Sequence, residues 1–366
     1  MDCLGFMLSD GAIINLALVL GLLYSALIVT FCNKIALLLG VVDHPGAQEH
    51  KSHAAPTPLV GGLVALPPVL AMLLLQYFQE GMSSTHAASY LALAFATLCS
   101  LIVGFFDDRR HIPALVRLII CSCIFGLAIS IRPDFVVSAL DLQGIGFKIE
   151  LGLLAIPFSV FCLLAFQNAV NMADGRNGLV GGVAIIWLLA LLSYGWHPLT
   201  PAIVSLAIGL LIALGANLGG RLFLGDAGTY GIGAFVGLAT IWFHRSNIGL
   251  HTIDVVIMFM IPVLDMVRLF VFRIFQGRHP FSADHNHLHH CLDSSIGWTY
   301  GRKIYYALVA LPIVFSRLQL MDPLILLLLG FIPYSLFIVI GYRKARAGSL
   351  ADRRSAPGPC STVDNG

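Results

Sequence analysis

Long apolar runs fill most of the 366-residue chain and constrain its fold more than any other feature. About 20 apolar residues are enough to cross a bilayer as an α-helix. No polar stretch is long enough for a separate soluble domain, so we expect an all-α, polytopic membrane protein with about eleven transmembrane helices. Residues 1–341 would form one transmembrane domain and residues 342–366 a short basic tail. The expected spans lie roughly at 12–32, 59–79, 87–106, 114–131, 149–167, 179–195, 201–218, 229–243, 251–268, 304–316 and 322–341, the tenth being shortened by Arg317.

The composition excludes several other classes of protein. Hydrophobic residues make up 58% of the chain and charged residues only 11%, whereas soluble domains carry about 25% charged residues. The net charge of +2 leaves no basic surface typical of nucleic-acid binding. The 8 cysteines are scattered without a C-x-x-C pair, which disfavours a disulfide scaffold or a thiolate metal site.

The positive charges predict which way the chain is inserted. If the eleven spans alternate in direction, 17 of the 21 Lys and Arg residues fall into one of the two sets of loops. Loops rich in Lys and Arg stay in the cytoplasm. We therefore expect a periplasmic N-terminus and a cytoplasmic C-terminus, with every acidic and histidine cluster described next on the cytoplasmic side.

Two adjacent carboxylates, Asp107 and Asp108, follow the third span and precede Arg109 and Arg110. Adjacent carboxylates repel each other, and such a pair suits a divalent metal or a general base beside one. An interfacial cap, in which the two arginines neutralise the pair, is the alternative interpretation.

Four polar side chains recur every three residues where the fifth span ends. They are Asn168, Asn171, Asp174 and Asn177, and this spacing gathers them on one side of a helix. Amides and carboxylates there can hydrogen-bond a base and a sugar or ligate a hard metal ion. A simple polar break between two helices is the alternative.

A glycine-rich turn precedes the eighth span and contains Asp226, shortly after Asn217 and Phe223. The N-terminus of the following helix offers partial positive charge to phosphates, and Phe223 could stack on a planar base. A turn that only introduces a helix explains the pattern equally well.

Histidines cluster in the long basic loop 265–303, where His287, His289 and His290 follow Asp284 and His285. Zinc sites draw on ligands from several segments, and no cysteine cluster accompanies these residues. We favour phosphate binding over a metal site or a solvated loop. In loop 43–62, Lys51 is a compact cation that suits a phosphate. The alternative is that its positive charge only keeps this loop in the cytoplasm.

Taken together, these motifs resemble the polyprenyl-phosphate N-acetylhexosamine-1-phosphate transferase family (glycosyltransferase family 4), in its WecA-like branch and related to the MraY-like enzymes. The resemblance runs from Asp43 to about Leu292 and rests on the order of five motifs. These are the D-x-P/K-x-H/P-x-x-GG loop, the DDR, the N-x-x-N-x-x-DG-x-x-GL, the F-x-GDAG and the H-x-HH.

The resemblance implies a reaction at the bacterial plasma (inner) membrane, with the active site facing the cytoplasm. A UDP-N-acetylhexosamine, with UDP-GlcNAc expected, would give its sugar 1-phosphate to undecaprenyl phosphate and release UMP. This is the initiating step of a cell-envelope polysaccharide of the O-antigen or lipopolysaccharide type. Mg²⁺ is the expected cofactor, with Mn²⁺ as an alternative. A homodimer is compatible with the resemblance.

The resemblance also implies residue roles. Asp107 or Asp108 would orient or deprotonate the lipid phosphate, and the metal would be held by Asp226, Asp108 and Asp174. Substrate would be bound by Lys51, Asn168, Asn171, Asp174, Asn177, Asn217, Phe223, His287, His289 and His290.

Two positions depart from the family pattern and bear on sugar specificity. Asn177 replaces an Asp, and His285 replaces an Arg. One alternative is that the chain is a non-catalytic relative of the family, and Asn177 is the only feature that favours it. A membrane transporter is the other alternative, although transporters place ionisable groups near the bilayer midplane, and here they lie at span ends.

Overall fold

The structure is a computed structural model and describes residues 10–45, 55–81, 84–142, 146–246, 248–282 and 286–355. Within these residues, one long helix forms in each of the eleven predicted apolar runs, which confirms the all-α, polytopic prediction. They are α1 (Asp10–Thr30), α3 (Gly61–Glu80), α4 (Ala87–Arg110), α5 (Ala114–Ile131), α6 (Ala155–Ala173), α7 (Leu179–Leu192), α8 (Thr200–Leu218), α9 (Gly225–Arg245), α10 (Thr252–Phe275), α12 (Trp298–Arg317) and α13 (Pro323–Ser355). Two shorter helices, α2 (Cys32–Leu39) and α11 (Leu288–Ile296), lie between them.

Eight of the helices in the described residues are long and apolar enough to cross a membrane. They are α1, α3, α4, α5, α6 with the turn before it, α8, α10 and α13, while α7 is apolar but has only 14 residues. Helices α9 and α12 have 21 and 20 residues but are not among the eight. The multi-pass character is therefore confirmed, and eleven crossings stay a prediction.

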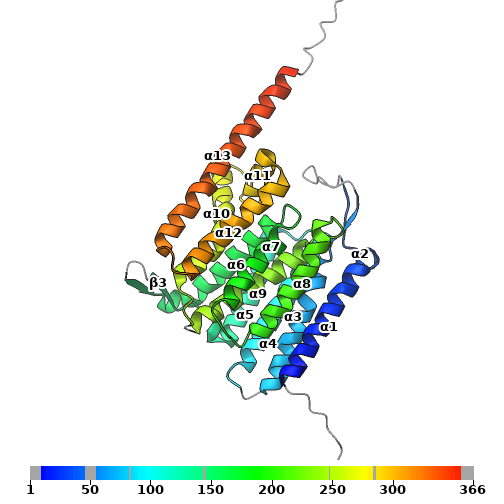
Figure 1. Cartoon of the computed structure of the whole chain (residues 1–366), viewed down its shortest axis with the longest axis vertical. Helices are drawn as coiled ribbons and strands as arrows, with labels where there is room; N and C mark the ends of the chain where they lie inside the picture. The colour runs from blue at the N-terminus through cyan, green and yellow to red at the C-terminus, as the bar shows by residue number, and fades with distance from the viewer. Residues whose placement is uncertain are drawn as a thin grey trace, which may run out of the picture.

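Helix α9 is the central helix of the bundle, and α3, α4, α6 and α7 pack around it (Figure 1). Its side chains are buried almost without interruption from Ala227 to Phe243. Glycines on α9 lie directly against neighbouring side chains, as Gly231 does against Leu66 and Gly237 against Leu163. Small residues allow helices to approach closely inside a membrane bundle, so the glycines of α9 have a packing role.

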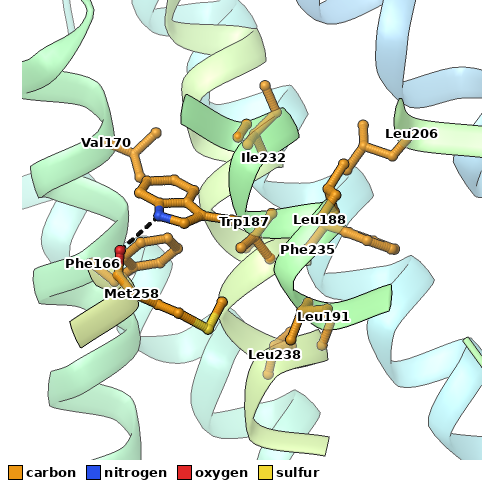
Figure 2. Packing of buried hydrophobic residues seen from close by; sticks show 14 of the residues in the cluster. Phe166, Val170, Trp187, Leu188, Leu191, Leu206, Ile232, Phe235, Leu238 and Met258 are labelled. Atoms are coloured by element: carbon orange, nitrogen blue, oxygen red, sulfur yellow. Dashed lines mark hydrogen bonds between the residues drawn. The ribbon is translucent and has the colours of Figure 1, made fainter. Parts of the chain in front are cut away.

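The core of the bundle is apolar and closely packed, as Figure 2 shows around Trp187. The indole ring of Trp187 packs against both Phe166 and Phe259, with ring centroids 5.2 Å from each. Its Nε1 donates a hydrogen bond of 2.8 Å to the backbone carbonyl of Met258, so the polar group of a buried tryptophan is satisfied.

The β-structure in the described residues consists of two short antiparallel pairs. Strand β1 (Val42–Asp43) pairs with β2 (Thr57–Pro58), and β3 (Ala139–Leu142) pairs with β4 (Phe147–Glu150). Neither pair was expected from the sequence. Phe147, Lys148, Ile149 and Glu150 alternate between apolar and polar, which is a strand pattern. Because the hairpin and a 3₁₀ turn (Gly152–Leu154) occupy these residues, α6 begins at 155 rather than 149.

The start of α1 and the end of α13 lie at opposite ends of the long molecular axis (Figure 1). Helix α13 runs without a break through residue 342, where the sequence suggested that a separate tail begins. The first turns of the predicted tail thus continue the last helix.

Candidate active site

A cleft of about 800 Å³ opens where six separate segments of the chain meet. Ligand sites are typically clefts of about this size, with a few polar groups converging on them. Eight of the sequence-predicted residues line it: Asp108, Asn171, Asp174, Asn177, Asn217, Phe223, Asp226 and His290. The prediction that distant motifs meet in one place is consistent with this arrangement.

Asp108, in the last turn of α4, reaches across to the start of α9. Its Oδ1 accepts the backbone N–H of Asp226 at 2.9 Å, and its Oδ2 accepts that of Ala227 at 3.0 Å. A carboxylate is favourable at this place because the first N–H groups of a helix lack partners within it. Asp108 thereby caps α9 from another helix while it faces the cleft.

Glycines make this contact sterically feasible. A side chain at Gly104 would overlap the backbone of Asp226, so α4 and α9 can approach only because position 104 has none. Gly225 has a φ of +73°, in the left-handed region that favours glycine. A Cβ atom at Gly225 would lie 2.8 Å from Oδ2 of Asp108.

Asp107 has different surroundings from Asp108, although the two are adjacent. It is 1% exposed, forms an ion pair with Arg117, and accepts the backbone N–H of Ile112 at 2.7 Å. It is not among the described residues that line the cleft. The alternative interpretation, an interfacial cap neutralised by Arg109 and Arg110, does not describe Asp107, because its ion-pair partner is an arginine of α5.

Asp226, Asn171 and Asp174 form the polar floor of the cleft. The Asn171 side-chain amide donates to Oδ1 of Asp226 at 2.7 Å and to the Thr229 hydroxyl at 3.0 Å. Asp174 follows the end of α6, and its backbone N–H bonds to the carbonyl of Asn171 at 3.1 Å. Burial, with the nearby Asp226 carboxylate, raises the pKa of Asp174 to about 7. Such a group is sensitive to any cation placed between the two carboxylates.

The carboxylates fit Mg²⁺ better than a metal held entirely by protein ligands. No three His, Cys, Asp or Glu side chains in the described part of the chain are arranged to hold a metal by themselves. Mg²⁺ is usually bound by one or two carboxylates together with water and substrate phosphates. Asp226 and Asp174 offer such hard oxygen donors, whereas both oxygens of Asp108 already accept backbone N–H groups.

Asn217, near the end of α8, holds two turns of the cleft wall. Its Oδ1 accepts the backbone N–H of Gly178 at 2.5 Å, and its Nδ2 donates to the carbonyl of Leu222 at 2.9 Å. Phe223 is held by a backbone bond of 2.8 Å to Pro58, which ties the 223–226 turn to β2. Asn217 thus positions the loop that carries Asn177, and Phe223 adds an aromatic wall.

Asn168 is one of the predicted residues that the cleft does not include among its described lining. It lies one turn back in α6, and its amide donates to the Leu164 carbonyl at 2.8 Å. Three residues along a helix amount to about 4.5 Å of rise. The three-residue repeat therefore brings Asn171 and Asp174 to the cleft but leaves Asn168 below them.

The histidine segment divides into one residue at the cleft and two behind it. His290 lines the cleft, whereas His287 and His289 are buried. His287 Nδ1 lies 3.0 Å from a carboxylate oxygen of Asp265. The His289 ring stacks on His287, and a side chain at Gly175 would overlap it.

His289 is neutral in these surroundings. Burial, together with the neighbouring His290 and His287, holds its pKa well below the ordinary 6.5. Its Nε2 has no hydrogen-bond partner among the described residues. His289 therefore carries no full positive charge, and it is not among the described residues that line the cleft.

Lys51 lies outside the described residues, as do Asp284 and His285. Other cations reach the cleft: Arg109 lines it, and so does Arg176, which forms an ion pair with Asp293 of α11. Neither arginine was predicted to bind substrate, and Arg109 was considered only as a partner of the adjacent carboxylates, because a positive charge near a membrane edge is usual in any membrane protein.

Sequence reasoning also missed Trp298 and Asp265. Trp298 lines the cleft from the first turn of α12, and a single tryptophan in an otherwise ordinary helix start gives no signal. Asp265 accepts from His287, from Arg268 at 2.8 Å and from the Tyr334 hydroxyl at 3.1 Å. An acidic residue inside a span with Arg268 three residues later was the available signal.

Comparison with known proteins agrees with this geometry. Residues 90–244, which include Asp107, Asp108, Asn171, Asp174 and Asp226, match the family described as Glycosyl transferase family 4. A protein of Escherichia coli strain K12, named undecaprenyl-phosphate alpha-N-acetylglucosaminyl 1-phosphate transferase, is 30% identical over 287 residues, covering 74% of each chain. A protein of the same name from Escherichia coli O157:H7 is 28% identical over 358 residues, 91% of this chain and 93% of its own. A Bacillus subtilis protein, named a probable transferase of this kind, is 26% identical over 294 residues, 76% and 77% of the two chains.

Proposed function

Because this chain belongs to glycosyl transferase family 4, we propose that it transfers N-acetylglucosamine 1-phosphate from UDP-N-acetylglucosamine to undecaprenyl phosphate. The products are undecaprenyl-diphosphate N-acetylglucosamine and UMP, and the reaction begins the synthesis of a cell-envelope polysaccharide. The observation that carries the proposal is the meeting of Asp108, Asp174 and Asp226 with three asparagines in one cleft of a multi-pass membrane protein.

The reaction joins two anions, so the site must orient them and balance their charge. An oxygen of the lipid phosphate attacks the phosphorus that carries the sugar, and a new P–O bond forms. The P–O bond to the uridine side breaks, and UMP leaves with that electron pair. Arg109 and Arg176 line the cleft and supply fixed positive charge for the transferred phosphates.

Asp108 is the acidic residue that we assign to the lipid phosphate, because it faces the cleft while Asp107 is paired with Arg117. Its carboxylate is held in place by two backbone N–H groups. A carboxylate with a fixed orientation can keep the lipid phosphate deprotonated and aligned.

Asp226 and Asp174 would hold Mg²⁺, which when bound supplies positive charge to the diphosphate. Asn171 fixes one oxygen of Asp226 through its amide. The uridine and the sugar would lie toward Asn177, Asn217 and Phe223, which line the same cleft.

We infer that the cleft faces the cytoplasm of a bacterial inner membrane. The placement of 17 of the 21 Lys and Arg residues in one set of loops supports this orientation. The start of α1 and the end of α13 lie at opposite ends of the molecule, as an odd number of crossings requires. A reporter enzyme fused to the C-terminus should be active only in its cytoplasmic form, and a periplasmic signal would contradict the orientation.

The decisive experiment uses membranes that contain the protein, UDP-N-acetylglucosamine and undecaprenyl phosphate. We expect UMP release that depends on the lipid, with a lipid-linked diphosphate sugar seen by mass spectrometry. Membranes that contain the Asp226→Asn variant are the matched control. Lipid-independent UMP release, or none from the wild-type protein, would reject the proposal.

A further inference from the structure

The turn between α6 and α7 is held by the segment that contains α11 and α12. Four consecutive residues of this turn, 175–178, each contact that segment. The contacts are Gly175 with the His289 ring, Arg176 with Asp293, the Asn177 carbonyl with Trp298, and the Gly178 carbonyl with Tyr306. Such continuous contact indicates that the two segments move as one unit.

Trp298 contacts this turn through a directed hydrogen bond. Its Nε1 donates to the backbone carbonyl of Asn177 at 2.8 Å, and the residue also lines the cleft. The Asn177 side chain is therefore left to face the cleft, while its backbone is fixed by α12.

Tyr306 makes the next bond along the turn. Its hydroxyl donates to the carbonyl of Gly178, which also accepts the Gly182 backbone N–H at 3.0 Å. A methyl group at Gly182 would overlap the Tyr306 hydroxyl, so position 182 leaves the space that this bond needs. A Cβ atom at the adjacent Gly181 would lie 3.6 Å from Leu214, which is an ordinary contact.

The opposite side of the turn is held by α8, because the Gly178 N–H donates to the Asn217 side chain at 2.5 Å. Gly178 has a φ of +85° and serves as the N-cap residue of α7. The Asn177 C=O and the Gly178 N–H belong to the same peptide unit. The bonds from Trp298 of α12 and to Asn217 of α8 therefore fix the plane of that unit from two sides.

We propose that Trp298 and Tyr306 are positioning residues that set the place of the Asn177–Gly178 turn, and through it the binding of the nucleotide sugar. The part of this inference that concerns substrate rests on the function proposed above. Neither residue acts on the reacting atoms. Their effect is expected in the affinity for the UDP-sugar and not in the chemical step or in the affinity for the lipid.

The first test measures the turn itself and needs no activity. Trp298→Phe keeps an aromatic ring, Tyr306→Phe keeps its own ring, and each removes the donor group. Gly182→Ala displaces the Tyr306 hydroxyl. Hydrogen exchange at the amides of residues 177–179 should accelerate by about fivefold in all three variants, the effect of one lost hydrogen bond. Trp187→Phe and Gly181→Ala are matched controls, because the first also removes an indole bond to a carbonyl, far along α7, and the second also adds a methyl group. Equal acceleration in variants and controls, or in none of them, would overturn the proposal.

The second test measures kinetics in detergent-solubilised enzyme. The three variants should raise the KM for UDP-N-acetylglucosamine about five- to tenfold, since a displaced turn weakens one or two polar contacts. The kcat and the KM for undecaprenyl phosphate should change less than about twofold. A fall in kcat with an unchanged KM would overturn the positioning role. A wild-type enzyme that does not turn over would reject the proposed function, while the exchange experiment would still decide whether Trp298 and Tyr306 hold the turn.

Discussion

The carboxylate of Asp108 accepts the backbone N–H of Asp226 at 2.9 Å. Asp108 therefore caps α9, the helix whose first turn contains Asp226, a second acidic residue of the cleft. The two carboxylates belong to segments more than a hundred residues apart, and Gly104 allows their helices to approach. Any displacement of Asp108 therefore also displaces the start of α9, and the two residues are coupled structurally as well as chemically.

This coupling predicts the effect of removing either charge. Asp108→Asn and Asp226→Asn should each lower kcat by at least about 10²-fold, the usual scale for a lost acid–base or electrostatic group. Because an Asn side chain has only one acceptor oxygen, Asp108→Asn also loses one of the two caps on α9. Steady-state kinetics with the amount of folded protein measured in parallel will test this. Near-normal turnover in both variants would contradict the assignment.

Asp107→Asn should lower the stability of the folded protein more than Asp108→Asn does. The substitution leaves the half-buried Arg117 guanidinium without its carboxylate, at a cost of about 1–3 kcal/mol. We expect a lower thermal unfolding temperature and less folded protein in detergent. Arg117→Gln in the same background should recover part of this loss, because it removes the unpaired charge. If the single variant is fully stable but inactive, Asp107 belongs to the chemistry instead.

Chelation should show whether activity needs a metal held by oxygen ligands or needs zinc. EDTA should abolish transfer and Mg²⁺ should restore it, because carboxylate oxygens rather than thiolates are the donors in the cleft. A zinc-selective chelator should have little effect. Recovery with zinc alone would reassign the histidine segment as a metal site.

His289 should make the folded protein less stable in mild acid. Its pKa in the folded state lies well below 6.5, so below pH 6.5 the unfolded chain binds a proton that the folded chain does not. Stability is then complete above about pH 6.5 and falls toward lower pH, by up to about 1.4 kcal/mol per pH unit. Unfolding temperatures between pH 7.5 and pH 5 should drop less in His289→Gln than in the wild type. Identical pH profiles would show that His289 titrates normally.

Asn177→Asp should alter substrate preference. The Asn177 side chain lines the cleft, and its amide offers donors that a carboxylate lacks. We expect a change in KM or in the preferred UDP-sugar that is worth about 1–3 kcal/mol of discrimination, with a smaller effect on kcat. Competition between UDP-GlcNAc and a second UDP-N-acetylamino sugar will measure it. An inactive wild type that gains turnover with Asp at position 177 would identify the chain as a degenerate relative.

The sequence was sufficient to predict which motifs gather, but not how each side chain is used. Hydropathy and charge predicted that Asn171, Asp174 and Asp226 lie on the same side of the membrane, and the structure brings them together in the cleft. The three-residue repeat also suggested Asn168, because spacing gives the helix face and not where the cleft ends along it.

The parts that sequence reasoning missed depend on tertiary contacts. Asp107 and Asp108 are indistinguishable as neighbours in sequence. Tertiary contacts distinguish them, because Asp107 pairs with Arg117 of α5 and Asp108 caps α9. The role of Trp298 depends on the Asn177 carbonyl, which lies 121 residues away. The β3–β4 hairpin was missed because its alternating residues lie next to a longer apolar run.

The enclosure of α9 has a consequence for how the enzyme tolerates its surroundings. Lipids differ in thickness and stiffness, and helices that border the bilayer tilt or bend to match them. Helix α9 is shielded from that adjustment by the helices packed around it, so a change in lipid composition can reach Asp226 only by first shifting a neighbour such as α4. The helix whose first turn contains Asp226 is therefore surrounded by protein and not by lipid.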